Sequence, residues 1–452
     1  MRSITYLAAS ALTVSIGMSA SIALSRAGNA SVVQPGGISR SSSNAGLKAS
    51  ATKLTPSGNH YKESVIYRFG SNSTGDGEYP AAAVADDHGV LYGTTLLGGY
   101  DNQGTVFALT PSGSGYTETI AYSFGGSSSS GSDGTQPSAN LILVRSALLG
   151  TTYYGGPYGY GTVFRLAASR RRGYIETVLH GFQRGSTDGG EPMAGLLIDR
   201  KTGALYGTTA LGGAKGNGTI FKLTPSGDGY TESLLYSFRG TPNDGAGPYG
   251  ALVADRTGAL YGTTSQAGSN SSCDGGCGTV FKLTFSGSAY TETVLHSFQG
   301  EPDGARPYAA LIIDDKTGTL YGTTTEGGQG PSPGYGTVFE LSPSEAGYTE
   351  SILHSFGGKP DDGANPQASL IEERGELYGT TSSGGTYGAG TVFKMVPAAS
   401  NYSERLVYSF QGGTDGAGPV ASLIDVYGAL YGTTYGGGTP SASQGTVFEL
   451  TR

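Results

Sequence analysis

The sequence predicts an all-β fold: a single seven-bladed β-propeller with four antiparallel strands per blade, closed by its N-terminal strand. Three observations predict it. One unit recurs seven times, each unit holds four strand-like segments, and the two ends of the repeat region carry incomplete units that complement each other. Propellers are built from four to eight blades of four-stranded sheets, so the unit corresponds to one blade. A β-solenoid is the alternative, but its coils are shorter than this unit.

The second and third segments of each unit are the most regular. The second reads Leu-Tyr-Gly-Thr-Thr, or Leu-Leu-Gly-Thr-Thr in one copy, and its glycines are 53 to 60 residues apart. Runs rich in Thr, Tyr, Val and Phe between turn residues are typical of strands. These glycines are Gly93, Gly150, Gly207, Gly262, Gly322, Gly379 and Gly432. The third segment, Gly-Thr-Val/Ile-Phe, begins at Gly104, Gly161, Gly218, Gly278, Gly336, Gly390 and Gly445.

The other two segments flank this pair, and we expect one to be innermost and the other outermost. The innermost candidate opens with a proline that follows Asp-Gly-x-x. These prolines are Pro80, Pro137, Pro192, Pro248, Pro307, Pro366 and Pro419. The outermost candidate has the form Tyr-x-Glu-x-x-x-Tyr/His-x-Phe and ends at Phe69, Phe124, Phe182, Phe238, Phe298, Phe356 and Phe410.

Counting these segments predicts how the ring closes. The seventh unit ends after its Gly-Thr-Val-Phe segment, whereas Tyr61–Phe69 precedes the first proline segment without a blade of its own. We therefore expect Tyr61–Phe69 to pair with Gly445–Leu450. In that arrangement Val65, Tyr67 and Phe69 point into the packing, and Glu63 and Arg68 stay near solvent.

The N-terminal region is predicted to direct export. Residues 1–30 resemble a secretory signal peptide, with Arg2 before an apolar run and small residues suited to cleavage after Ser25 or Ala30. An uncleaved membrane anchor is the alternative. Residues 31–50 form a Ser/Gly-rich linker, and the propeller occupies residues 51–452. We expect a secreted or periplasmic monomer with no membrane span in the mature chain.

Composition excludes two classes of protein. The chain has 79 glycines, yet 10% of its residues are aromatic, which a disordered Gly-rich chain would lack. Only 14% of residues are charged and the net charge is −8, so no basic surface for nucleic acid is expected. No metal-ligand spacing or cofactor motif appears, so we predict no metal and no cofactor.

The repeat resembles that of the Gloeo_Verruco (GloVer) tandem-repeat family of exported bacterial proteins. The resemblance rests on the Leu-Tyr-Gly-Thr-Thr, Gly-rich loop, Gly-Thr-Val-Phe and Leu-Thr-Pro-Ser-Gly segments and covers about Leu54 to Arg452. It implies a repeat propeller and no particular reaction. Members of that family typically carry an anchor after the repeats; here Arg452 follows the last strand, which favours free export.

Several polar residues recur in every unit. We interpret the aspartates of Asp-Gly-x-x-Pro as turn residues, with Gly at positive φ and Pro starting a strand, although a ring of carboxylates that attracts cations is the alternative. The glutamates of Tyr-x-Glu are interpreted as solvated edge charges. His180, His296 and His354 replace a tyrosine and are interpreted as packing residues. The aspartates are Asp76, Asp133, Asp188, Asp244, Asp303, Asp362 and Asp415. The glutamates are Glu63, Glu118, Glu176, Glu232, Glu292, Glu350 and Glu404.

Two features occur once. Cys273 and Cys277 are the only cysteines and lie in an enlarged loop of the fourth unit. In an exported protein they predict a local disulfide, because a redox Cys-x-x-Cys motif has two intervening residues rather than three. Arg170–Arg172 replaces a hairpin turn and is expected to be a solvated tip, with anion docking as the alternative.

The candidate ligand-binding positions are those where the units disagree, beside the inner proline. Varied size and charge are expected where packing does not dictate the residue. The candidates are Tyr79, Gln136, Glu191, Tyr249, Arg306, Tyr308 and Asn365.

Two functions remain open from the sequence. The first is a binding or scaffold protein that engages a glycan, peptide or surface partner through one face or the channel mouth. It is favoured because every polar constellation is repeated, whereas catalysis needs one asymmetric cluster. The alternative is a polysaccharide lyase or hydrolase in which Glu191, Arg306 and Tyr308 act on the substrate. Catalytic residues are otherwise unknown, and whether these three converge discriminates between the functions.

Overall fold

A computed structural model describes residues 61–70, 75–85, 89–113, 115–125, 133–169, 173–227, 229–270, 272–398, 402–439 and 443–452. The predicted signal peptide, the linker and Arg170–Arg172 lie outside these residues. The chain divides into a unit Met1–Pro56 and a unit Ser57–Arg452, and all described strands belong to the second. Within the described residues there is no helix of the length and hydropathy needed to cross a membrane.

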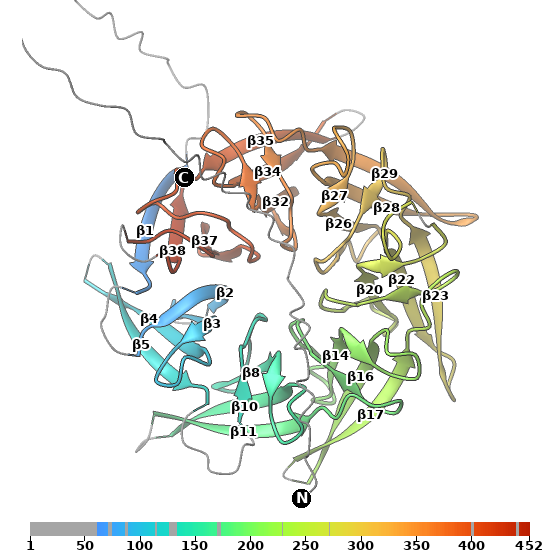
Figure 1. Ribbon diagram of the computed structural model, residues 1–452, viewed down its shortest axis with the longest axis horizontal. Coiled ribbons are helices and arrows are strands. Elements are labelled where there is room, and N and C mark those ends of the chain that lie inside the picture. The colour runs from blue at the N-terminus through green and yellow to red at the C-terminus, as the bar shows by residue number, and fades with distance from the viewer. Residues whose placement is uncertain are drawn as a thin grey trace, which may run out of the picture. The chain divides into compact units, whose positions relative to one another are not determined.

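Seven four-stranded antiparallel sheets, the blades, are arranged in a ring (Figure 1). Blade 1 contains β2 (Gly77–Ala85), β3 (Leu91–Gly98), β4 (Thr105–Ser112) and β5 (Gly115–Ser123). Blade 2 contains β7 (Ile142–Val144), β8 (Ala147–Thr152), β10 (Thr162–Ser169) and β11 (Gly173–Gly181). Blade 3 contains β13 (Leu197–Ile198), β14 (Leu205–Thr209), β16 (Thr219–Ser226) and β17 (Gly229–Ser237). Blade 4 contains β19 (Val253–Ala254), β20 (Leu260–Thr264), β22 (Thr279–Phe285) and β23 (Tyr290–Ser297).

The remaining blades repeat the order. Blade 5 contains β25 (Ile312–Ile313), β26 (Leu320–Thr324), β28 (Thr337–Ser344) and β29 (Gly347–Ser355). Blade 6 contains β31 (Ile371–Glu373), β32 (Glu376–Thr381), β34 (Thr391–Pro397) and β35 (Tyr402–Ser409). Blade 7 contains β36 (Ile424–Val426), β37 (Ala429–Thr434), β38 (Thr446–Thr451) and the N-terminal β1 (Lys62–Arg68).

Blades 2 to 6 also carry a two-stranded ribbon that joins the Asp-Gly segment to the Gly-rich loop. The ribbons pair β6 (Gly134–Thr135) with β9 (Tyr154–Gly155), β12 (Gly189–Gly190) with β15 (Leu211–Gly212), β18 (Gly245–Ala246) with β21 (Gln266–Ala267), β24 (Gly304–Ala305) with β27 (Glu326–Gly327), and β30 (Gly363–Ala364) with β33 (Ser383–Gly384). The Asp-Gly-x-x-Pro segments and the Gly-rich loops therefore share one side of the ring, which we call the loop face.

The inner strands differ from the prediction. In blades 2 to 7 they span only two or three residues, and the proline precedes them in irregular backbone; only Pro80, in β2, lies within a strand. The N–H group of the residue before each proline donates to the preceding blade rather than to its own sheet. In blade 1 the strand nevertheless continues, with Pro80 opposite Thr95 and a register shift after it.

Closure of the ring by β1 is confirmed. β1 pairs antiparallel with β38, from Lys62 opposite Thr451 to Arg68 opposite Thr446. Phe69 is fully buried and Arg68 is exposed, as expected. The first and last blades also touch directly, because the backbone of Gly445 packs against the ring of Pro80.

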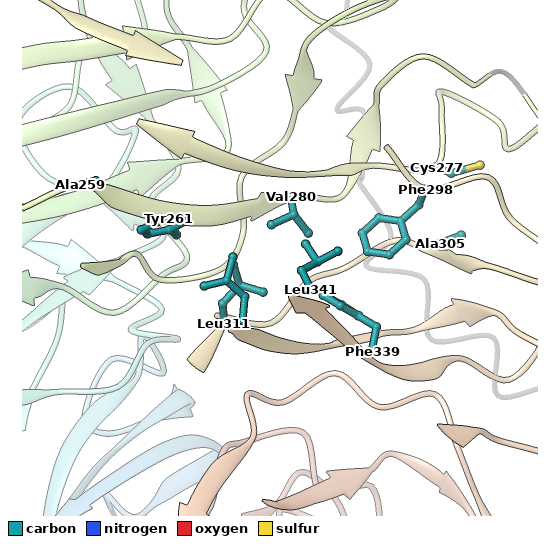
Figure 2. Packing of buried hydrophobic residues seen from close by; sticks show 10 residues of the cluster. Ala259, Tyr261, Cys277, Val280, Phe298, Ala305, Leu311, Phe339 and Leu341 are labelled. Atoms are coloured by element: carbon teal, nitrogen blue, oxygen red, sulfur yellow. The ribbon is translucent and has the colours of Figure 1, made fainter. Parts of the chain in front are cut away.

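The hydrophobic core lies between neighbouring blades. Figure 2 shows one such layer, in which Val280 and Phe298 of blade 4 face Phe339 and Leu341 of blade 5. The rings of Phe298 and Phe339 meet edge-to-face with centroids 5.2 Å apart. Each Leu-Tyr-Gly-Thr-Thr glycine leaves room for the aromatic ring of the adjacent strand.

Threonine side chains join blades around the ring. The first threonine of each Gly-Thr-Thr donates to a carbonyl of the next blade over 2.9 to 3.5 Å, and Thr433 closes the circle by donating to Pro80. The second threonine bonds the threonine of Gly-Thr-Val-Phe in its own blade at 2.7 to 2.8 Å. Buried hydroxyls are thereby satisfied, which explains why threonine recurs at both positions.

Tyrosine pairs form a further link at the side of the ring opposite the loop face. Hydroxyl groups lie 3.0 to 3.4 Å apart in Tyr61–Tyr378, Tyr116–Tyr431, Tyr174–Tyr92 and Tyr402–Tyr321. The pairs Tyr290–Tyr206 and Tyr348–Tyr261 occupy equivalent positions and interact through their hydroxyls. At the junction of blades 2 and 3 the partner of Tyr230 is Leu149, so this pair is missing.

Candidate functional site

The backbone of the loop face is set by the residue before each inner proline. All seven residues at this position have φ between 55° and 63°, in the left-handed region. Each donates its N–H to a carbonyl of the preceding blade, as Glu191 does to Tyr160 at 2.8 Å. The conformation persists in non-glycine residues because this inter-blade hydrogen bond holds it. The seven residues are Tyr79, Gln136, Glu191, Gly247, Arg306, Asn365 and Gly418.

This geometry corrects the interpretation of the Asp-Gly-x-x-Pro turn. Apart from Gly416, the glycine after the aspartate does not have positive φ. It is small for another reason: a Cβ on Gly189 would lie 2.3 Å from Thr209 Oγ1. The turn role of the aspartate itself is confirmed, since Asp188 accepts hydrogen bonds from the backbone N–H groups of Gln183 and Gly189 at 2.8 and 2.7 Å.

Four of the candidate residues come together on neighbouring blades. The ring centroids of Tyr249 and Tyr308 lie 5.3 Å apart. Burial raises the pKa of Tyr249, and the nearby charges of Glu191 and Arg306 act on it in opposite directions. We call Glu191, Tyr249, Arg306 and Tyr308 the blade 3–5 arc.

The charged groups of the arc are each held by a partner. Glu191 is 7% exposed; its Oε2 accepts from the Tyr153 hydroxyl at 2.8 Å, and its Oε1 is 3.7 Å from the Arg184 guanidinium. Arg306 Nε donates to Glu326 Oε2 at 3.0 Å. These contacts orient the side chains and leave each negative group beside a positive one.

The disulfide loop borders the arc. Cys273 and Cys277 are bonded, as predicted, and Arg306 Nη2 donates to the carbonyl of Asp274 within their loop at 3.0 Å. Next to the loop is an open depression of about 470 Å³ lined by Asn217, Arg239, Gln266 and Asp274. In the sequence, the enlarged loop of the fourth unit is the signal that could have indicated this wall of the site.

The other candidates lie elsewhere. Tyr79 stacks on Tyr435, with ring centroids 4.7 Å apart, at the junction of blades 7 and 1. Asn365 is engaged within the fold, because its Nδ2 donates to the Thr325 carbonyl and its Oδ1 accepts from Ser383. Gln136, on blade 2, shows backbone bonds to Gln103 and Tyr153.

The outer junctions between blades hold a second set of polar groups. The Tyr or His near the end of each outer strand contacts the following aspartate, as Tyr236 does by donating to Asp244 at 2.8 Å. The histidines also pack as predicted: the rings of His354 and Phe356 lie 4.7 Å apart, edge-to-face.

The expectation that the Tyr-x-Glu glutamates are solvated is wrong. In all seven, Oε1 is buried and has no hydrogen-bond partner among the described residues. Burial, together with a nearby aspartate, raises the pKa of Glu118 and Glu176 to about 7, and the same holds for Glu292. The outer strand turns these side chains toward the preceding blade, so the outer edge does not expose them fully.

Sequence comparison identifies the family. The profile of the Gloeobacter/Verrucomicrobia repeat matches residues 29–274 and 270–452. The chain belongs to the Gloeobacter/Verrucomicrobia repeat family. A comparison of this repeat protein with curated proteins finds no match.

Several solved structures are similar to this member of the family at low identity, with TM-scores below 0.5. A candidate 6-phosphogluconolactonase from Bacteroides uniformis has a TM-score of 0.47 at 11% identity, covering 77% of this chain and 99% of its own. PorZ, a surface component of the type-IX secretion system of Porphyromonas gingivalis, has a TM-score of 0.49 at 15% identity, covering 84% and 47%. A candidate glucose dehydrogenase from Thermus thermophilus has a TM-score of 0.40 at 17% identity, covering 70% and 96%. None assigns a function to the Gloeobacter/Verrucomicrobia repeat protein.

Proposed function

We propose that the protein is a secreted or periplasmic binding propeller that holds a glycan on its loop face, at the blade 3–5 arc. The observation that carries the proposal is the convergence of Glu191, Tyr249, Arg306 and Tyr308 on neighbouring blades. Although these residues converge, binding is favoured over catalysis because the charged groups are engaged separately: Glu191 accepts from Tyr153, and Arg306 donates to Glu326.

The chemistry of the arc favours an uncharged, hydroxyl-rich ligand. Tyrosine rings offer flat apolar faces with a polar edge, which suits contact with a sugar ring. Glu191 and Glu326 are each next to a guanidinium, so the arc presents hydrogen-bonding groups without a strong excess of one charge. The amide, guanidinium and carboxylate groups of the adjacent depression extend the same kind of surface.

Export is proposed on separate grounds. A disulfide between Cys273 and Cys277 is typical of an oxidising compartment. Protein recovered from an exporting host is expected to lack residues 1–25 or 1–30 by intact-mass measurement. Retention of Met1 would contradict the signal peptide.

A glycan and peptide array with the mature protein tests the binding function. We expect retention of neutral oligosaccharides and a loss of at least 10-fold in affinity in the double variant Tyr249→Ala, Tyr308→Ala, as expected when two stacking rings are removed. The matched control is Tyr427→Ala, which removes an 84% exposed tyrosine from the turn between β36 and β37, at the other end of a blade. Equal affinity of both variants for the glycan would exclude the blade 3–5 arc as the binding site. If the array retains peptides selectively, the ligand is a peptide rather than a glycan. Release of shortened oligosaccharides would indicate that the protein is an enzyme.

A further inference from the structure

One outer junction brings together three metal-ligating side chains. His354 is the penultimate residue of β29 in blade 5, Asp362 lies in the turn that follows, and Glu404 projects from β35 of blade 6. One ligand atom from each lies within 4.8 Å of the other two. We propose that His354, Asp362 and Glu404 bind a divalent transition-metal ion of the Zn²⁺ class, which ties blade 5 to blade 6.

The spacing of the three groups is close to that of a metal site. With Zn–N and Zn–O bonds of about 2 Å, tetrahedral ligands lie roughly 3.3 Å apart. His354 Nε2 and Asp362 Oδ1 are already 3.2 Å apart. Only the Glu404 carboxylate has to approach, from at most 4.8 Å to about 3.3 Å, and its side chain has three rotatable bonds with which to do so. One position remains for water, as is common around Zn²⁺.

Glu404 has an unsatisfied carboxylate oxygen, as the other six junction glutamates do, but among the described residues only at this junction do a histidine and an aspartate lie close enough to the glutamate to complete a metal site. The Oε1 atom of Glu404 is buried and has no hydrogen-bond partner in the described part of the chain. A buried carboxylate oxygen without a partner is costly, and a cation at this place would satisfy it.

The surrounding groups hold the other two ligands in place. Asp362 accepts backbone hydrogen bonds from Gly357 at 2.7 Å and Gly363 at 2.8 Å. The ring of His354 packs edge-to-face against Phe356. Such outer contacts orient metal ligands and are a regular feature of metal sites.

The other junctions explain why we assign one site rather than seven. Histidine also occurs at His180 and His296, but among the described residues only the His354 group brings all three ligand atoms within 4.8 Å. The four remaining junctions have a tyrosine at this position: Tyr67, Tyr122, Tyr236 and Tyr408. The fold therefore accepts tyrosine here, which makes His354→Tyr a conservative way to remove the nitrogen ligand.

Calorimetric titration of the untagged protein with Zn²⁺, and the visible absorption of added Co²⁺, test the site. We expect one strongly bound ion per chain. The His354→Tyr variant should weaken binding by more than about 100-fold, since even loss of an outer-shell contact costs 10- to 100-fold. The metal-free melting temperature of this variant should be unchanged. His296→Tyr is the matched control and should alter affinity by less than about 2-fold.

A second variant keeps the test decisive if His354→Tyr fails to fold. Glu404→Gln preserves the shape of the side chain and removes its charge, so it should also weaken Zn²⁺ binding strongly. Absence of Zn²⁺ binding by the wild-type protein would overturn the proposal. So would equal affinity in wild type and either site variant, or an equal loss in His296→Tyr.

Discussion

The outer junctions and the blade 3–5 arc are made from the same repeat, yet they use it in opposite ways. At the junctions, aspartate, glutamate and tyrosine or histidine return in every blade with the same contacts. On the arc, the residues beside the inner prolines of blades 3, 4 and 5 are Glu191, Tyr249 and Arg306, and each has a different partner. The residues that repeat in every blade are therefore those that hold the ring together. The residues that vary lie where one blade differs from the others.

The largest effect should come from breaking closure. A chain that starts after Phe69 lacks β1 and leaves the edge of β38 unpaired, and it should aggregate or melt far below the intact ring. The loss should exceed the roughly 3–5 kcal/mol of a single Phe→Ala change, because the whole strand is lost with buried Phe69. A chain that starts at Tyr61 retains β1 and serves as the control in thermal melts. Equal melting temperatures would show that β1 does not latch the ring.

A smaller effect is expected from filling the core of a single blade. In Gly207→Ala the new Cβ would lie 2.5 Å from Cζ of Phe221, a ring that is buried and cannot move away. We expect a loss of about 1–3 kcal/mol in urea unfolding. Gly229→Ala, at a hairpin tip where the nearest atom is 4.0 Å away, should change stability little. Unfolding of both variants at the same urea concentration would contradict the expected clash between the new Cβ and the ring of Phe221.

The junction glutamates predict a pH effect of known sign. Burial raises the pKa of Glu176 in the folded protein to about 7 from 4.5. The folded state thus holds this proton more tightly than the unfolded state, and the stability it contributes is present below pH 4.5 and is lost as pH rises through 7. Glu176→Gln should therefore unfold at a higher temperature than wild type at pH 8 and at a similar one at pH 4.5.

Differential scanning calorimetry at both pH values measures this difference. Glu345→Gln, a change at an exposed glutamate, is the matched control and should show no such dependence on pH. A Glu176→Gln variant that is less stable than wild type at pH 8 would mean that the buried charge has a partner after all.

The smallest expected effect is an increase in stability. Leu149→Tyr would restore the missing tyrosine pair between blades 2 and 3, where the Tyr230 hydroxyl now donates to the carbonyl of Gly203 at 3.5 Å. One additional hydrogen bond should add about 1 kcal/mol and raise the melting temperature by a few degrees. Leu149→Phe has nearly the same size without the hydroxyl and separates the hydrogen bond from the packing. A decrease in both variants would show that this junction is shaped around leucine.

Much of the ring could be predicted from the sequence, because its information is local and repeated. Segment spacing predicts the blades, and the unpaired Tyr61–Phe69 predicts β1 next to β38. Cys273 and Cys277 are close enough in sequence to predict their bond. Each of these inferences needs only strand propensity, turn residues and counting.

The errors concern contacts between blades. The glutamates alternate with exposed residues along the outer strand, so their burial depends on the neighbouring blade, which the pattern of a single strand does not reveal. The Asp-Gly glycine is small because of a threonine about 20 residues away, as Gly189 is against Thr209. His354, Asp362 and Glu404 share one junction although 50 residues separate the first from the last, so no short motif could have indicated them.

The left-handed residue before each inner proline has a consequence for how this protein can change. Its backbone is held by the blade behind it, whatever its side chain, and Tyr, Gln, Glu, Arg, Asn and Gly all occupy the same φ range. A substitution at this position therefore changes the side chain on the loop face without changing the backbone of the ring. In blades 4 and 7 this position is held by Gly247 and Gly418. Introducing a side chain at either glycine costs on the order of 1–2 kcal/mol of backbone strain. Such a loop face could be redesigned one blade at a time, and selection could use the same route to move from one ligand to another.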